Sequence, residues 1–405
     1  MTSVRNAGPL AGADQGDDRM QALDRYWCEL AGQMREPGKV LDREPDAIGT
    51  FLDLHAVRFI RERGMPARYR TDTDLPADLL DAAATCHGVV TMLERAGYGD
   101  PAIVPAAPGP SLSGTVVQAL ADDAQSEWYH GRLASEPTYT FFGLTEPAKG
   151  SAAVELTTTL TPAPDSDGWL LNGEKRYVGN GARAQLGVVF CRRTPGPLGI
   201  EAVLVDTSAP GLSAGLLPMI GLRGARISWL RFENVRIPAD RMLGARLRPS
   251  RRGLQGALYG LYRFRPGIAA LALGCAEATQ EYLGMHRCRL AKADQSEVDD
   301  LADRIAAVRG LLHRVAVDID HDRCDPHRIG AVKAQAAQVA EEMTMLATRL
   351  LGPASLIEHP WLEKTCRDVR AFDIMEGPAN LHRLAVFQGL RKGTYQPGGG
   401  NAARH

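Results

Sequence analysis

The spacing of apolar residues changes twice along this 405-residue chain, and this change constrains the fold more than any other feature of the sequence. From about residue 18 to residue 136 apolar side chains recur at helical intervals, as in the run from Leu79 to Ala96, which we expect Gly97 to end. From residue 138 to about residue 244, short apolar or alternating runs separated by Gly- and Pro-containing turns are typical of β-strands. After Arg252 the helical spacing returns. The sequence therefore predicts an α+β protein in the order helices, strands, helices.

Chain length and these transitions predict the domain organisation. A single hydrophobic core stops growing at roughly 250 to 300 residues, so we expect two or three packed units. The predicted segments are a disordered N-terminus (1–17), an all-helical domain (18–137), a middle β domain (138–246), a C-terminal helical bundle (247–393) and a flexible tail (394–405). The long helices expected in the bundle cover residues 257–290, 298–324, 330–351 and 360–375.

Composition excludes several classes of function. With 47 basic and 48 acidic residues, dispersed along the chain, there is no electrostatic footprint for nucleic acid. The polar start has no signal-peptide core, and no stretch reaches the roughly 18 apolar residues that span a bilayer, so we expect no membrane contact and a cytoplasmic location. The seven cysteines show no metal-ligand spacing, and neither they nor the histidines predict a metal site.

Several motifs lie along the chain in a fixed order. The first is FFGLTEPAKGS at 141–151, the second DGWLLNGEKRYVGNG at 167–181, in which Asn172-Gly173 is expected to form a tight turn, and the last DIMEGPAN at 373–380. In this order they resemble the acyl-CoA dehydrogenases. The resemblance implies an N-terminal helical domain, a middle β-barrel-like domain and a C-terminal four-helix bundle, in a divergent member of that family.

The resemblance also implies FAD, bound between the β domain and the C-terminal bundle. A flavin ring is large, flat and mostly apolar, so it needs a rigid sheet wall and a few polar contacts at its edge. By resemblance Phe142, Leu144 and Thr145 lie against the ring, and Leu144 and Thr145 supply backbone and hydroxyl contacts to its pyrimidine side. Ser151 lies near the pyrophosphate or the thioester arm of the substrate by the same resemblance. Thr145 and Ser151 are equally able to satisfy a local turn, and that alternative stays open.

The hairpin motif supplies further flavin contacts by resemblance. Tyr177 covers one face of the ring where the family often has Trp, and Val178 follows it in the same motif. Gly179 stands where the family usually has a Thr or Ser that contacts flavin N5, so this hydrogen bond is lost or comes from the backbone.

Glu376 matches the carboxylate base of the family. Dehydrogenation of an acyl thioester removes a proton from the carbon beside the carbonyl, and burial raises the pKa of a carboxylate toward the pH at which it works as a base. We expect Gly377-Pro378 to end the preceding helix directly after Glu376 and to start the next, with Gly377 beside substrate and cofactor. Arg265 matches a family Arg near this base and either orients it or lies on a helix surface; an ordinary helix-terminal role for Glu376 is the competing interpretation.

The C-terminal motifs depart from the family pattern. Pro378 replaces a Thr, and His382 stands where Gln is common. In the family an Arg four residues after a Tyr reaches the flavin of a neighbouring subunit; here Tyr282 is followed by His286, and we expect Arg287 to substitute for that Arg as a cofactor contact.

These features together predict an FAD-dependent dehydrogenase of acyl thioesters, in which hydride passes from the β-carbon to flavin N5. The expected partners are an acyl-CoA or an acyl carrier protein of specialised metabolism, an electron-transfer flavoprotein or similar external acceptor, and other copies of the chain in a homodimer or homotetramer. Arginines between 246 and 252 suit either an acidic carrier protein or the phosphates of CoA. Two alternatives stay open: a flavin monooxygenase or oxidase on the same fold, and a flavin-free binding or scaffold protein.

Overall fold

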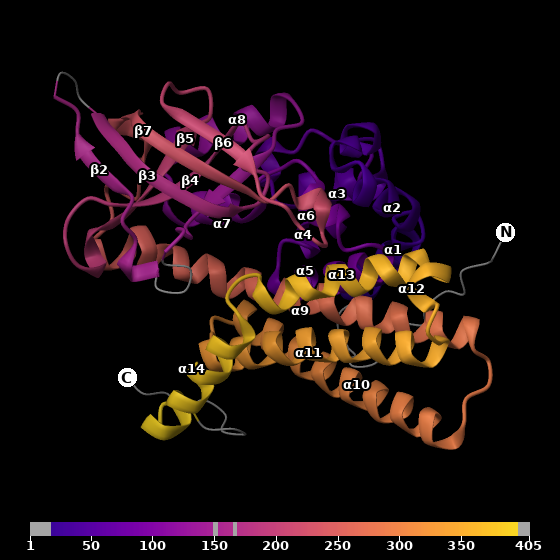
Figure 1. Ribbon diagram of the computed structural model, residues 1–405. Helices are drawn as coiled ribbons and strands as arrows, with labels where there is room; N and C mark the ends of the chain where they lie inside the picture. The colour runs from indigo at the N-terminus through magenta and orange to yellow at the C-terminus, as the bar shows by residue number, and fades with distance from the viewer. Residues whose placement is uncertain (1–17, 149–152, 165–167, 396–405) are drawn as a thin grey trace. The chain divides into compact units, whose positions relative to one another are not determined.

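The computed structural model describes residues 18–148, 153–164 and 168–395 (Figure 1). Contacts divide these residues into two compact units: a first unit of residues 25–84 and 100–261, and a second unit of residues 18–24, 85–99 and 262–395. Ser151, the predicted N-terminal segment and nearly all of the predicted tail lie outside the described residues.

Short helices and a β-sheet make up the first unit. Helix α8 shows why these segments are helical: Asp122 accepts a hydrogen bond from Gln125 N (2.9 Å), and the Gln125 side chain accepts one from Asp122 N (3.1 Å), which closes a capping box. The helices are α2 (Arg35–Arg43), α3 (His55–Arg63), α4 (Ala77–Ala82), α6 (Ile103–Ala106), α7 (Ser111–Leu120) and α8 (Asp123–Ser135), while α1 (Asp18–Ala31) runs from the second unit into the first.

Within the described residues the sheet has eight strands in the order β6-β7-β3-β2-β4-β5-β8, with β1 pairing in parallel with β4. Figure 1 labels β2 to β7. The strands are β1 (Thr140–Gly143), β2 (Thr159–Pro162), β3 (Gly168–Val178), β4 (Leu186–Arg192), β5 (Ile200–Asp206), β6 (Leu212–Leu216), β7 (Ser228–Pro238) and β8 (Met242–Leu243). Strands β2 and β4 meet at one residue pair, Thr159 with Arg192, so the long β3–β7 ribbon joins the rest of the sheet mainly through β2.

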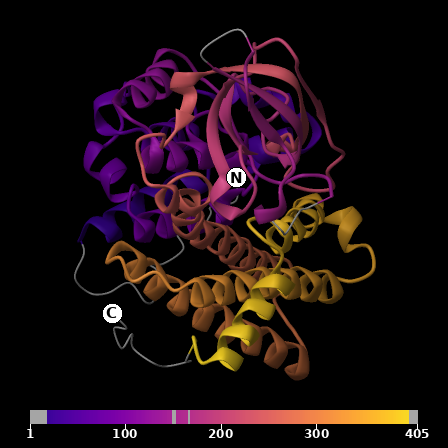
Figure 2. The same ribbon diagram turned by 90° about the vertical axis from the view of Figure 1, so that its left-hand side faces the viewer.

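Alternate residues of the central strands enter two separate cores. On β4, Val188 and Phe190 pack with side chains of α7 and α8, whereas Val189 and Cys191 pack with side chains of β3, β5 and β7. Because β3 and β7 share a core with β4 and β5, the sheet curls back on itself, as Figure 2 also shows. The predicted β-barrel-like fold of the middle segment is confirmed.

Long helices form the second unit, and α11 lies at its centre, packed against α10, α13 and α14 (Figure 1). Asp325 begins α11 by accepting hydrogen bonds from the backbone N–H of His327 (2.9 Å) and Arg328 (3.3 Å). The helices are α5 (Cys86–Gly99), α9 (Gly253–His286, from residue 262 onward), α10 (Lys292–Asp320), α11 (Pro326–Leu351), α12 (Ser355–Glu358), α13 (Pro360–Ile374) and α14 (Ala379–Lys392). The predicted order of helical region, sheet and helical bundle is confirmed.

Two local predictions are wrong. Gly97 does not end a helix: it lies inside α5, where the backbone of α9 comes so close that a Cβ on Gly97 would lie 2.2 Å from Leu271 O. Asn172-Gly173 forms no turn between strands but lies within β3 at an irregularity of its pairing with β7, and Gly173 has a φ of +142°. In both places the glycine permits a close backbone approach or a bulge.

Among the residues the structure describes, no helix is long and apolar enough to cross a membrane.

Candidate active site

Glu376 lies in the short junction between α13 and α14. Helix α13 ends at Ile374, two residues before Glu376, and Pro378 precedes the first residue of α14. The expectation that the helix continues to Glu376 is therefore wrong by two residues, and the expectation that Pro378 starts the next helix is wrong by one. The reason is backbone conformation: Glu376 has a φ of +53° and Gly377 a φ of +99°, which no helix accommodates.

Two cationic side chains hold this kinked junction. Arg265 on α9 donates from Nε to the carbonyl oxygen of Glu376 at 2.8 Å. Lys333 on α11 donates from Nζ to the carbonyl oxygens of Gly377 (2.7 Å) and Asp373 (2.8 Å). Arg265 thus lies beside Glu376 and contacts its backbone. Lys333 was not predicted, because nothing in the local sequence connects it with a loop more than forty residues away.

The surroundings of Glu376 suit a general base. Burial raises the pKa of its carboxyl, while the positive charges of Arg265 and Lys333 act in the opposite direction. Burial also lowers the pKa of Arg265. The result is a partly buried carboxyl group with cations nearby to stabilise its ionised form.

His382 on α14 packs against the same junction. A Cβ on Gly330 would lie 2.8 Å from His382 Nδ1, and a Cβ on Gly377 would lie 3.1 Å from His382 Nε2, so two glycines make room for the ring. Burial, with the charges of Arg265 and Lys333, lowers the pKa of His382 to about 4. The imidazole is therefore neutral near pH 7.

In the first unit, β1 and the loop after it form an apolar wall. Phe142 and Leu144 are partly buried against the core that α7, α8 and the sheet share, and the Phe142 ring lies 5.3 Å from that of Phe190. The carbonyl of Thr145 accepts a hydrogen bond from Arg176 N at 2.9 Å, which fixes the loop to β3.

The end of β3 presents Tyr177 outward. The pairing of β3 with β7 is irregular between Lys175 and Val178, and Tyr177 has a φ of +60° and an exposure of 61%. The Val178 side chain is buried in the sheet core, so only its backbone is available to a ligand. Gly179 has open space, since the nearest atom to an added Cβ is Ala225 O at 3.9 Å.

A buried ion pair supports this wall and was missed in the sequence. Lys175 is fully buried and donates to Leu144 O (3.1 Å) and to Glu146 Oε1 (2.8 Å). Glu146 also accepts hydrogen bonds from the backbone and hydroxyl groups of Thr157 and Thr158. A signal did exist: Lys175 is spaced by an even number of residues from Leu171, on the same buried side of β3.

Arg287, the predicted substitute for a family Arg, follows the last residue of α9 and donates to the carbonyl of Leu350 near the end of α11. Its neighbour His286 stacks on Tyr282 at 4.0 Å, and Tyr282 also stacks on Trp361 at 4.6 Å. A contact between Arg287 and FAD stays a prediction.

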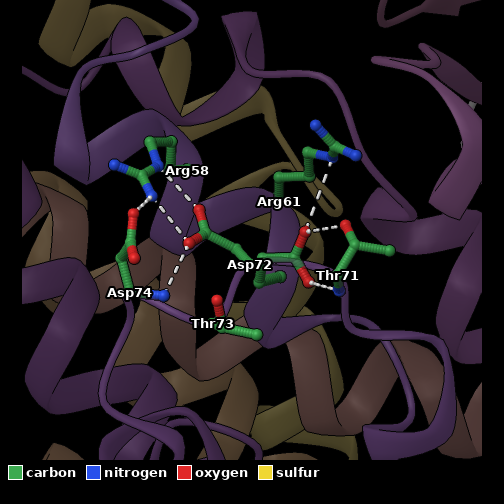
Figure 3. A pocket seen from close by; sticks show the side chains of 7 residues that line it. Arg58, Arg61, Thr71, Asp72, Thr73 and Asp74 are labelled. Atoms are coloured by element: carbon green, nitrogen blue, oxygen red, sulfur yellow. Dashed lines mark hydrogen bonds and ion pairs between the residues drawn. The ribbon is translucent and has the colours of Figure 1, made fainter.

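A hollow of about 290 Å³ on the first unit contains none of the predicted site residues (Figure 3). Its polar groups satisfy one another: Arg58 Nε lies 2.6 Å from Asp72 Oδ2, and Glu62 accepts a hydrogen bond from Thr71 N at 3.1 Å. Across the described ranges, no cluster of three His, Cys, Asp or Glu side chains is arranged to bind a metal ion.

Comparison with known proteins places these two sets of residues in one family. Residues 141–235 match the family model for the acyl-CoA dehydrogenase middle domain, and residues 251–390 match that for the C-terminal domain. An acyl-CoA dehydrogenase of Bacillus subtilis (strain 168) is 30% identical over 288 residues, 68% of this chain and 74% of that protein. The acryloyl-CoA reductase (NADH) of Anaerotignum propionicum is 29% identical over 280 residues, 66% of this chain and 70% of that protein.

A similar solved structure is that of the prolyl acyl carrier protein oxidase AnaB, with a TM-score of 0.78 and 20% identity over 92% of this chain and 99% of that one. The match covers the helical N-terminal region, the sheet and the bundle, so the whole fold is shared. With its divergent sequence and this fold, the chain belongs to the acyl-CoA dehydrogenase family.

Proposed function

We propose that this protein is an FAD-dependent dehydrogenase of acyl thioesters, with Glu376 as the base that removes the proton next to the thioester carbonyl. The observation that carries the proposal is the environment of Glu376: a carboxyl group at a kink between two helices, with its pKa raised by burial and two cations beside it. A base with a raised pKa accepts a proton more readily than an exposed carboxylate does. Bound FAD supplies the acceptor for the hydride that leaves the β-carbon.

The residues of the sheet fit an isoalloxazine ring. Phe142 and Leu144 offer a rigid apolar wall, Tyr177 offers an exposed ring, and Gly179 leaves space beside the strand end. The backbone groups of Thr145 and Val178 are the polar contacts that we assign to the ring edge. Arg265 and Gly377 position Glu376, and the backbone N–H of the base is the donor that we assign to the thioester carbonyl.

The substrate carrier and the partners belong to the same proposal. The solved protein AnaB is described as acting on an acyl carrier protein, and Arg246, Arg248 and Arg251 of this chain are exposed. These arginines suit an acidic carrier protein as well as the phosphates of CoA. We further propose an external electron acceptor such as an electron-transfer flavoprotein, a homodimer or homotetramer, and a cytoplasmic location.

Replacement of Glu376 by Gln tests the proposal. Gln has the same size and cannot accept the proton, so E376Q should retain FAD but lose bleaching of the flavin absorbance by acyl thioesters, by about 10²- to 10⁴-fold in rate. Stopped-flow absorbance with acyl-CoA and acyl-carrier-protein thioesters measures this rate.

E358Q, a change at an exposed glutamate of α12 in the same unit, is the matched control and should bleach at the wild-type rate. Bleaching that persists in E376Q would remove Glu376 from the mechanism. A wild-type protein without a flavin band, even after FAD is added, would favour the scaffold alternative, and oxygen uptake during turnover would favour the oxidase.

A further inference from the structure

Lys333 is a buried cation with an unusual set of partners. Its exposure is 0%, as is that of Lys175, and Lys364 is nearly as buried. Lys175 lies 2.8 Å from Glu146, and Lys364 lies 2.6 Å from Asp368, so each has a carboxylate partner. Within the described residues no carboxylate lies within 4 Å of Lys333, and its ammonium donates to two carbonyl oxygens. A buried ammonium without a carboxylate partner is costly, so a specific role is expected for it.

The two carbonyl oxygens lie on either side of Glu376. Asp373 O belongs to the last turn of α13, whose carbonyls have no partner within the helix, and Gly377 O belongs to the junction. A cation at the C-terminal end of a helix also interacts favourably with the helix dipole. One ammonium therefore joins the end of α13 to the residue after Glu376 and closes the loop that carries the carboxylate.

We propose that Lys333 is a positioning residue for the base: it fixes the left-handed kink at Glu376 by bridging Asp373 O and Gly377 O, and its positive charge favours the ionised form of the Glu376 carboxyl. This inference rests on the proposed role of Glu376. It assigns to α11 a direct part in the site, although α11 contributes no group that reacts with the substrate.

The titratable groups around Lys333 come from three helices and from the junction. Arg265 lies on α9, Asp373 on α13 and His382 on α14, and Glu376 lies in the junction. Burial and the charge of Arg265 lower the pKa of Lys333, while Asp373 and Glu376 raise it, with a result of about 8. Lys333 is thus charged near neutral pH, whereas His382, with a pKa of about 4, is not. Removal of the Lys333 charge should therefore raise the pKa of Glu376 further. The acid limb of the pH–rate profile should then move to higher pH.

Two variants separate the effect of the two Lys333 hydrogen bonds, which tether the junction, from the effect of its charge. K333M removes both, and K333Q removes the charge but keeps an amide that donates to the carbonyls. In K333M we expect amide hydrogen exchange in residues 373–382 to accelerate about tenfold or more, with a smaller change in K333Q. In both variants the pH midpoint of flavin bleaching by an acyl thioester should rise by about 1 unit. Hydrogen-exchange mass spectrometry without substrate and stopped-flow absorbance from pH 5 to pH 9 measure these quantities.

K364M is the matched control, because it removes another buried lysine of the same unit. It should lower stability and leave both the exchange of residues 373–382 and the pH midpoint unchanged. A slower reaction with an unchanged midpoint in K333Q and K333M would mean that Lys333 is merely structural, and unchanged exchange in K333M would overturn the tether. Failure of E376Q to slow bleaching would instead reject the proposed function. The hydrogen-exchange result would then still report whether Lys333 holds residues 373–382 in place.

Discussion

Single residues with left-handed backbone determine how two of the proposed site residues are presented. Tyr177, with a φ of +60°, turns an aromatic ring outward at the end of β3, and Glu376, with a φ of +53°, lies between two helices. Such a conformation costs a non-glycine residue on the order of 1 kcal/mol or more, so neighbouring contacts must compensate for it. At Glu376 those contacts are the hydrogen bonds from Arg265 and Lys333.

Gly179 offers a direct test of the flavin site in the first unit. An added side chain meets only Ala225 O, at 3.9 Å from the Cβ, so G179S should fold normally. A hydroxyl at this position adds one hydrogen bond to the flavin, and we expect the FAD dissociation constant of G179S to fall about 2- to 10-fold relative to G179A. Fluorescence titration of the apoprotein with FAD measures this difference. Equal affinities of G179S and G179A would show that residue 179 does not face the flavin.

The residues of the site differ in how well the sequence predicts them. Glu376 and Arg265 could be singled out because each matches a position of the family pattern, and the structure brings the two into contact. Lys175 and Lys333 act through hydrogen bonds to segments distant in the chain, and a lysine gives no pattern of its own that points to burial. Long-range polar contacts are therefore the part that sequence reasoning missed.

At the scale of secondary structure, the crossing of α5 and α9 depends on two glycines. A Cβ on Gly97 would lie 2.2 Å from Leu271 O, and a Cβ on Gly274 would lie 1.9 Å from Glu94 O. Backbone atoms cannot move aside as the end of a flexible side chain can. The two helices therefore touch backbone to backbone, a contact that only glycine permits.

The mutation G274A should push α5 and α9 apart where they cross. We expect it to lower the free energy of unfolding by about 1–3 kcal/mol or more, although Ala is the better helix former. G284A in the same helix meets no atom within 4 Å and should raise stability by about 0.5–1 kcal/mol. Urea unfolding followed by circular dichroism compares the two variants. Similar effects of both changes would mean that the crossing is less close than described.

Helix positions were predicted better than helix ends. The four long helices of the bundle lie where apolar periodicity indicated, but α9 starts at Gly253 and ends at His286, earlier at both ends than expected. Periodicity reports which residues face a core, whereas an end depends on backbone angles and caps such as Asp325 before α11. The run from Leu79 to Ala96 likewise divides into α4 and α5.

At the scale of the whole molecule, each unit contains a buried acidic group with cationic partners. In the first unit burial opposes ionisation of Glu146, but Lys175 and the two threonines lower its pKa to about 2. In the second unit Glu94 is fully buried, and His313 and Arg309 keep its pKa below the usual range despite burial. Glu146 therefore stays ionised well into the acid range, and the pKa of Glu94 lies below its ordinary value.

The mutation E146Q should therefore destabilise the protein in a pH-dependent way. At pH 7 it leaves Lys175 buried without its carboxylate, and we expect a loss of about 3–5 kcal/mol in the free energy of unfolding. Because the folded pKa of Glu146 is depressed from 4.5 to about 2, the stability it contributes is present above pH 4.5 and is lost as the pH falls toward 2. Urea unfolding at pH 7, 4.5 and 3 should show the difference from wild type shrinking.

The control for this experiment is E233Q, which breaks an exposed ion pair with Arg231 and should cost less than about 1 kcal/mol at every pH. A constant difference between E146Q and wild type across the three pH values would contradict the assigned ionisation of Glu146.

The sequence predicted the order of helical region, sheet and bundle because apolar periodicity and ordered motifs both act over many residues. Division into the three predicted domains stays a prediction, since the contacts divide the chain into two units instead. That grouping depends on which helices pack against which, and α5 belongs with the bundle although it precedes the sheet in the chain. Local apolar periodicity does not show which helices pack against one another.

The backbone turn at Glu376 also decides which amino acids the position tolerates. Glycine, asparagine and aspartate enter left-handed conformations readily, whereas valine and isoleucine are strongly disfavoured there. Variants at position 376 should therefore form two groups. In one group the junction keeps its conformation and only catalysis is affected, and in the other the junction itself is disrupted. Only the first group reports on proton transfer, and mutational scans that count activity alone would merge the two.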